Sequence, residues 1–379
     1  MLPALLLLTL SCGDKDASDD TAGPTGGGHG DGGATDGGTG GDGGDGGTTD
    51  GGTTGACDAP TWRTEAQVRI DTQAELSTFC GSWNAVDGDL WVDVGGKEDP
   101  ITELDGIGCL CEVTGDLVIT GDSDLEEASA AGPSAAPPPP HVTGDIELYT
   151  LTRVGGDLRI SHHPNLGYVE GMRALVEVGG DLVLTGNPTQ QVASFYALQR
   201  VGGTVQVSDM EKLLILRLPL LTSLGGLQIG AEGDAATTYY LVEVLLTSLE
   251  AVTGDLRIVG PRNLASLQAP ALTTVGGALH LQDTCETVPA FDALTSVGSL
   301  TLAGMCALTD LSGFAALGAI TGQDEAGSSL RLAGDDHLDQ DEIAAFLSQL
   351  GSTGTGTVDT ANGGTCADAL APYGEGYCD

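Results

Sequence analysis

Cysteine is the residue type whose spacing in this chain points most clearly to chemistry. Two of the nine cysteines, Cys285 and Cys306, each lie six residues after a leucine, Leu279 and Leu300, that holds one fixed position in a repeat. Equal positions on neighbouring coils of a solenoid are about 4.8 Å apart, which is within the Cα separation that a disulfide requires. The spacing therefore predicts a Cys285–Cys306 disulfide.

The remaining cysteines lie near the two ends of the chain. Cys366 and Cys378 are expected to close the C-terminal tail, whereas four others lie at the start of the repeat: Cys57, Cys80, Cys109 and Cys111. The simplest pairing of these four joins 57 to 80 and 109 to 111, and crossed pairings stay open. With Cys12 set aside, eight cysteines are an even number, which is typical of an oxidising compartment.

Motifs for metal binding or catalysis are not found in the sequence. Cys109-x-Cys111 lacks the two-residue spacer of zinc sites, and His162-His163 follows a strand, where a polar turn is the simpler interpretation. The aspartates between residues 335 and 341 resemble a calcium loop, but Phe346 stands where the bidentate glutamate belongs. There is no Gly-x-Ser-x-Gly, His-Glu-x-x-His or phosphate-binding loop. We therefore expect no metal, no cofactor and no enzymatic activity.

The charge balance excludes one class of partner. The 379 residues carry 13 Lys+Arg against 54 Asp+Glu, a formal net charge of −41. A protein that binds a phosphate backbone needs a basic surface, so nucleic acid is not an expected partner.

A repeat runs through the chain from Cys57 onward, and it determines where the cysteines and the other candidate residues lie in the fold. Segments such as MRALVEVGGDLVL and APALTTVGGALHL share a Val-Gly-Gly turn followed by two apolar residues with a polar residue between them. The first of these two apolar residues is taken as the reference position, and successive references are commonly 21 to 24 residues apart: Leu90, Leu117, Leu158, Leu182, Val205, Leu227, Leu256, Leu279, Leu300 and Leu330. This period predicts a parallel β-solenoid of about ten coils.

The two ends of the repeat carry signals for short capping helices. Thr72-x-x-Glu75 and Asp339-x-x-Glu342 both have the capping-box pattern that begins a helix. Residues 126–142 form an Ala/Pro-rich insertion loop between two coils, and residues 340–379 form the expected C-terminal cap.

The Gly-Gly-x-Leu strands, the opening VRIDTQAELSTFCGSWNAVDGDLWV and the closing GDDHLDQDEIAAFLSQL resemble the receptor L-domain family, which is related to leucine-rich repeats. The likeness covers residues 57–379. It implies a right-handed β-solenoid and a binding or surface-structural role, as in receptor lobes and bacterial envelope lipoproteins. Because this chain has more coils than one receptor lobe, receptor contact residues are not transferred to it.

The residue after each reference position must point outward, because its two neighbours point inward. These ten positions include three arginines, two glutamines and a histidine: Arg159, Arg257, Arg331, Gln206, Gln228 and His280. Arginine offers forked donors to carboxylates and phosphates, so this row is the predicted binding face for an anionic or hydroxyl-rich partner. The alternative is that the arginines pair with nearby aspartates or cover the sheet.

The N-terminal segment predicts an envelope address. The apolar run 1–11 ends at Cys12 in the string Thr-Leu-Ser-Cys-Gly, which resembles a bacterial lipobox, so Cys12 is the expected site of lipidation after removal of a signal peptide. The alternative is a leader with an incidental cysteine. Residues 12–56 are rich in Gly and Asp, as in a disordered tether. Gly13 is not an acidic retention signal, which favours the outer membrane.

Together these features favour a non-enzymatic, lipid-anchored cell-envelope protein that binds another envelope protein or a glycan, or that has a structural role at the surface. The alternative function is a polysaccharide lyase or hydrolase on a parallel β-helix. Such an enzyme needs acids that converge on one strand face. Among the residues one and three positions after each reference, Asp93 is the single acid.

Overall fold

The computed structural model describes residues 57–94, 99–121, 144–230, 238–285, 289–305, 307–335 and 337–360, which all belong to the compact unit Gly51–Asp379. Several predicted features lie outside the described residues: the signal peptide 1–11, Cys12 and the tether 12–56, the insertion 126–142, and Cys306, Cys366 and Cys378.

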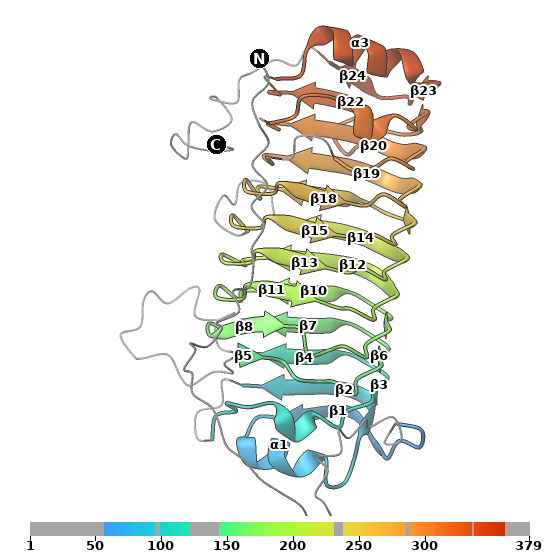
Figure 1. Ribbon diagram of the computed structural model, residues 1–379. Coiled ribbons are helices and arrows are strands. Elements are labelled where there is room, and N and C mark those ends of the chain that lie inside the picture. Colours follow the sequence, from blue (N-terminus) through green and yellow to red (C-terminus); the bar gives the residue numbers. More distant parts are fainter. Residues whose placement is uncertain are drawn as a thin grey trace, which may run out of the picture. The chain divides into compact units, whose positions relative to one another are not determined.

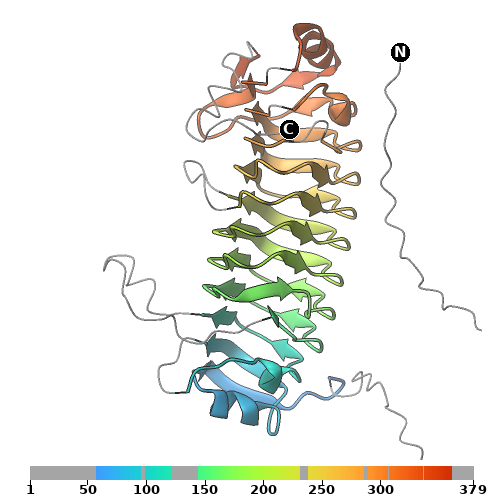
Figure 2. The same cartoon turned by 60° about the vertical axis from the view of Figure 1, so that its left-hand side comes forward.

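The described residues form two parallel sheets in a β-solenoid of about ten turns (Figures 1 and 2). The larger one, sheet A, has 18 strands among these residues: β1 (Trp62–Ile70), β2 (Ala85–Asp93), β3 (Glu112–Val113), β4 (Leu117–Thr120), β6 (Arg153–Val154), β7 (Leu158–Ser161), β9 (Glu177–Val178), β10 (Leu182–Thr185), β12 (Arg200–Ser208), β14 (Ser223–Ile229), β16 (Ala251–Val252), β17 (Leu256–Val259), β19 (Thr274–Gln282), β20 (Ser296–Ala303), β21 (Ala319–Ile320), β22 (Ser328–Ala333), β23 (Ser352–Thr353) and β24 (Thr357–Asp359).

Sheet B is shorter and lies in the middle coils. Its six strands among the described residues are β5 (Gly144–Asp145), β8 (Leu166–Val169), β11 (Val192–Ser194), β13 (Ile215–Arg217), β15 (Glu243–Leu245) and β18 (Ser266–Gln268). Most of these strands have three residues, of which the central one is buried, as are Ala193, Leu216 and Val244. Each of these middle coils therefore contributes side chains to the core from two sheets.

Aliphatic side chains form a continuous buried ladder on the inner side of sheet A. The ten reference positions pair in register from coil to coil and are at most 1% exposed, from Leu90 in β2 to Leu330 in β22. The residues two positions later are buried as well, because alternate side chains of a strand point to the same side. The predicted solenoid, the number of coils and the phase of the repeat are confirmed.

A left-handed residue ends many strands of sheet A. His162, Asp209 and Asp283 have φ angles of 59°, 52° and 53°, and Gly186 and Gly304 hold the equivalent position with 66° and 62°. Glycine adopts positive φ without strain, and Asp and His are among the side chains that tolerate it best. This corner, four residues after the reference, turns the chain out of sheet A.

Short helices lie at the two ends of the stack, as predicted (Figure 1). In α1 (Gln73–Phe79) the Thr72 hydroxyl accepts the N–H of Glu75 at 3.3 Å. In α3 (Gln340–Gln349) the carboxylate of Asp339 accepts the N–H of Glu342 at 2.9 Å. Two single-turn 3-10 helices, η1 (Asp105–Ile107) and η2 (Ser312–Phe314), complete the helical elements described. No helix among the described residues is long and apolar enough to cross a membrane.

Two disulfides close the N-terminal end of the solenoid. They join Cys57 to Cys111 and Cys80 to Cys109, with Cα separations of 5.5 and 5.8 Å. The pairing taken as simplest, 57 to 80 and 109 to 111, is therefore wrong, and a crossed pairing holds. The reason is that residues 109–111 run along the end of α1, where the N–H of Cys109 points at the sulfur of Cys80. Cys285 is also disulfide-bonded.

Candidate functional site

The side chains predicted to form a binding face lie in one straight row on the outer side of sheet A. Strand register joins ten residues on consecutive coils, here called the outer row: Trp91, Val118, Arg159, Val183, Gln206, Gln228, Arg257, His280, Thr301 and Arg331. All six predicted binding residues belong to it. Neighbours along the row are one strand spacing apart, about 4.8 Å.

The outer row is less open than the sequence suggested. Gln228 and Arg331 are exposed and the Arg159 side chain is 44% exposed, but His280 is only 8% exposed and Val118 is 5% exposed. Val118 is small and stands between Trp91 and Arg159, which are larger. An outward direction therefore does not make every position of this row exposed, and the accessible groups are the long side chains.

Several of these side chains already contact neighbours. The Arg159 guanidinium lies 4.0 Å from the carboxylate of Asp157, and Gln206 Nε2 donates to Asp181 Oδ2 at 3.2 Å. His280 Nε2 and Gln282 Oε1 are 3.1 Å apart. Pairing with aspartates, which was the alternative interpretation of the row, thus accounts for part of its contacts.

Near His280, the side chain of Asp283 has an altered acidity. Burial raises the pKa of the Asp283 carboxyl above its ordinary value. The hydrogen bond from Gln282 and the charges of Arg262 and His280 act in the opposite direction and favour the ionised form. The neighbours of Asp283 thus offset part of the effect of its burial.

A second row of polar side chains runs beside the outer row, and it was not predicted from the sequence. The residue before each reference also points outward, and in five coils it is an aspartate: Asp89, Asp116, Asp157, Asp181 and Asp255. Each Oδ1 accepts a main-chain N–H from the next coil, at 2.7 to 2.9 Å. We call these residues the aspartate ladder. The Gly-Asp-Leu triplet that all five coils share was the signal that could have revealed it.

The aspartate ladder explains the Gly-Gly pairs of the repeat. A Cβ atom at Gly180 would overlap Asp157 Oδ1 of the preceding coil, and a Cβ atom at Gly179 would overlap the carbonyl oxygen of Gly155. The first glycine lets the backbones approach, and the second leaves room for the carboxylate. The Gly-Gly pair therefore serves close approach of coils. Because each carboxylate of the ladder binds main-chain N–H groups, its evident role is to join coils.

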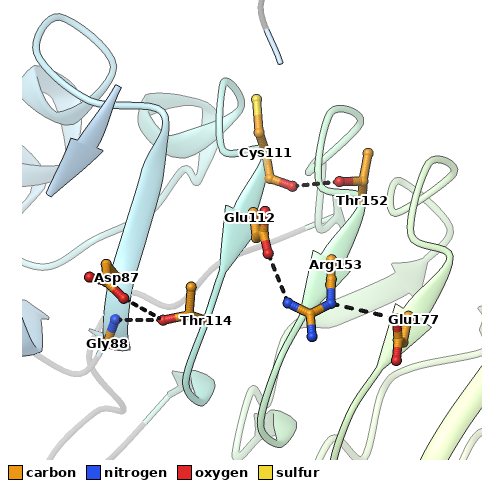
Figure 3. Close-up of polar contacts among 8 residues, drawn as sticks. All are labelled: Asp87, Gly88, Cys111, Glu112, Thr114, Thr152, Arg153 and Glu177. Carbon is orange, nitrogen blue, oxygen red and sulfur yellow. Dashed lines mark hydrogen bonds and ion pairs between the residues drawn. The ribbon is translucent and has the colours of Figure 1, made fainter. Parts of the chain in front are cut away.

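Alternating charges form a third row where the strands of sheet A begin (Figure 3). The Arg153 guanidinium lies 2.9 Å from Glu112 Oε1 and 3.5 Å from Glu177 Oε2, each in an adjacent coil. The hydrogen bond to Glu112 is the main cause that raises the pKa of Arg153. Figure 3 also shows the Thr152 hydroxyl, which donates to the carbonyl of Cys111 at 2.9 Å. These contacts cross-link neighbouring coils through side chains.

His162 and His163 lie at the corner after β7. His163 is fully buried. Its main-chain N–H donates to Asn187 Oδ1 at 2.8 Å, and its ring Nε2 lies 3.1 Å from the carbonyl oxygen of Ile119. His162 holds the left-handed corner position. Within the described ranges, no group of three or more His, Cys, Asp or Glu side chains is arranged to hold a metal ion.

No protein-family model, curated protein or solved structure matches this chain. The arrangement of its own side chains therefore carries the functional argument. The described surface offers long hydrogen-bonding side chains at regular spacing, flanked by carboxylates that are engaged with the backbone. Such a surface is suited to binding an extended partner.

Proposed function

We propose that this chain is a non-enzymatic, lipid-anchored cell-envelope protein of the receptor L-domain type, whose outer row binds a partner that carries carboxylate, phosphate or hydroxyl groups. The partner is an envelope protein or a glycan. The observation that carries the proposal is the row itself, in which Arg159, Gln206, Gln228, Arg257 and Arg331 follow one line across the sheet.

Regular spacing supports recognition of an extended partner. A flat parallel sheet presents successive side chains at a fixed interval, so a partner can bind several of them at once without a deep cleft. Arginine and glutamine supply donors. In a chain of net charge −41, three of the 13 basic residues lie in this row: Arg159, Arg257 and Arg331. Cleavage of acidic or neutral polysaccharides by this chain would instead favour the lyase or hydrolase alternative.

The outer row can be tested by removing two of its cations. Changing Arg159→Ser and Arg257→Ser together is expected to weaken binding of the partner at least about tenfold, because hydrogen bonds of charged groups each contribute roughly 1.5–3 kcal/mol. The partner is first recovered from envelope extract with the full chain as bait and identified by mass spectrometry. Its affinity for the variant is then measured by calorimetry.

A matched control removes two cations elsewhere. Arg63 and Arg217 form ion pairs with Glu65 and Glu243 at 3.0 and 3.1 Å, away from the outer row. Changing both to serine lowers the positive charge equally and is expected to leave the affinity within about twofold of wild type. Full affinity in the Arg159/Arg257 variant would show that the outer row is not the binding site.

The proposed lipid anchor makes a separate prediction. Cells that express the chain with radiolabelled palmitate are expected to label the wild type and not the Cys12→Ala variant, because the Cys12 thiol is the group to which the fatty-acid-bearing diacylglyceryl group is attached. Ser11→Ala keeps a small residue before the cysteine, so this control should still be labelled. Equal labelling of the Cys12→Ala variant would remove the lipoprotein proposal.

A further inference from the structure

A tight turn that joins sheet B to sheet A repeats in consecutive coils and presents a row of side chains that includes two tyrosines. In four neighbouring turns the N–H of a buried leucine donates to the carbonyl three residues earlier, at 3.2 to 3.4 Å: Leu151 to Leu148, Leu175 to Met172, Leu198 to Phe195 and Leu221 to Leu218. The first residue inside these four turns is Tyr149, Arg173, Tyr196 and Pro219, in order. We call these four residues the tyrosine ridge.

The coils of the tyrosine ridge are adjacent. The strands that follow the first three turns are β6, β9 and β12. Strand β6 pairs with β9, β9 pairs with β12, and β12 pairs with β14. Tyr149 and Tyr196 are therefore two strand spacings apart, about 10 Å, with Arg173 between them. Tyr149 is 47% exposed and Tyr196 is 38% exposed, so both present accessible ring surface.

A carboxylate holds one of the two tyrosine rings in place. The Tyr196 hydroxyl donates to Glu170 Oε1 at 3.0 Å, and Tyr149 lies two residues after Glu147. Burial and the interaction of its hydroxyl with Glu147 raise the pKa of Tyr149 above its ordinary value. Rings that are fixed before a ligand arrives lose little conformational entropy when they bind it.

A pocket adjoins the first coil of the tyrosine ridge. It has a volume of about 490 Å³ and is lined by Thr102, Glu103, Leu104, Asp105, Gly144, Asp145 and Glu147. Glu147 lines the pocket and lies two residues before Tyr149 in the chain, so the pocket lies next to the ridge. The volume is within the range of small-molecule sites.

The chemistry of these groups selects one class of ligand. None of the seven lining residues is basic and four are acidic, so the pocket repels anions. Its carboxylate and hydroxyl oxygens accept hydrogen bonds from hydroxyl groups. Tyrosine rings offer an apolar face next to a polar edge, which suits a sugar ring with C–H groups on its face and hydroxyls at its rim.

We propose that the tyrosine ridge and the adjoining pocket bind a neutral oligosaccharide. Successive sugar rings lie on Tyr149, Arg173 and Tyr196, and the end of the sugar chain occupies the pocket. This site goes beyond the proposed function, because it uses residues other than the outer row and takes an uncharged ligand. Either site can fail without the other.

The test measures binding of defined sugars to the full chain by calorimetry. The probes are pentasaccharides of β-linked glucose, xylose and N-acetylglucosamine, and a pectate oligosaccharide serves as the anionic probe. At least one neutral probe is expected to bind and the anionic probe is not. The exposed tyrosines do not belong to the core, so Tyr149→Ala with Tyr196→Ala should fold and weaken binding roughly a hundredfold, about tenfold for each ring.

Two controls distinguish the ridge from other surfaces. Tyr240 is 50% exposed and is not part of the ridge, so Tyr240→Ala should leave binding unchanged. The Arg159/Arg257 variant of the outer row should also retain full affinity for the sugar. The proposal is overturned if no neutral probe binds, if the pectate oligosaccharide binds better than the neutral probes, or if the Tyr149/Tyr196 variant keeps wild-type affinity.

Discussion

Alanine at Gly179 is expected to lower the free energy of unfolding by about 3 kcal/mol, at the upper end of the usual effect of overpacking. The added Cβ atom would overlap the carbonyl oxygen of Gly155 in the preceding coil. A backbone oxygen cannot rotate away as a flexible side chain can, so the two coils must separate. Separation would also stretch the bond from Asp181 N–H to Asp157 Oδ1, which is 2.8 Å long.

The measurement is urea unfolding followed by circular dichroism, with a matched control at Gly318. A Cβ atom at Gly318 meets nothing within 4 Å, and the residue is not in the left-handed region. Gly318→Ala should therefore leave stability unchanged or raise it slightly, because alanine restricts the unfolded chain. Equal stability of the two variants would contradict the conclusion that Gly-Gly pairs serve close approach of the coils.

The spacing of apolar residues was sufficient to predict sheet A. Leu256 and Ile258 alternate with polar residues and recur at one phase in each coil, so the ladder, its direction and the outer row followed from the sequence. Leu264 and Leu267, which follow in the same coil, are buried as well. Sheet B was not predicted, because a three-residue strand with one inward side chain gives no alternation to detect.

The aspartate ladder and the tyrosine ridge do not follow from the apolar repeat that predicts sheet A. The position before each reference was not counted as outward, so the aspartate ladder was missed, although a Gly-Asp-Leu triplet marks each of its five residues. Tyr149 and Tyr196 do not fall in a strand, and their alignment depends on the turn that Leu148 and Phe195 begin. Glycines that allow positive φ angles lie in the described Gly-Gly pairs, whereas the structure has the positive φ angles at the later corner that includes His162.

Removing the Cys80–Cys109 disulfide is expected to destabilise the N-terminal end of the solenoid by about 4 kcal/mol. The bond closes a loop of 29 residues, and the chain entropy released in the unfolded state grows with the length of this loop. Because each coil of a solenoid contacts only its neighbours, the loss should be local. Hydrogen exchange of the Cys80→Ser/Cys109→Ser variant should accelerate in α1 and β1 and remain unchanged in β17 and β19.

Single variants test the pairing itself, because each removes one partner of a known bond. Cys57→Ser is expected to leave Cys111 as the free thiol, and Cys80→Ser is expected to leave Cys109 free. Alkylation before reduction, followed by peptide mass spectrometry, identifies which thiol is labelled. A label on Cys80 in the Cys57→Ser variant would instead indicate the pairing of 57 with 80, and it would mean that residues 109–111 do not run along the end of α1. Since the bond from Cys111 N–H to the carbonyl of Asn84 is 2.7 Å long, such a result would also displace β3 from its position beside β2.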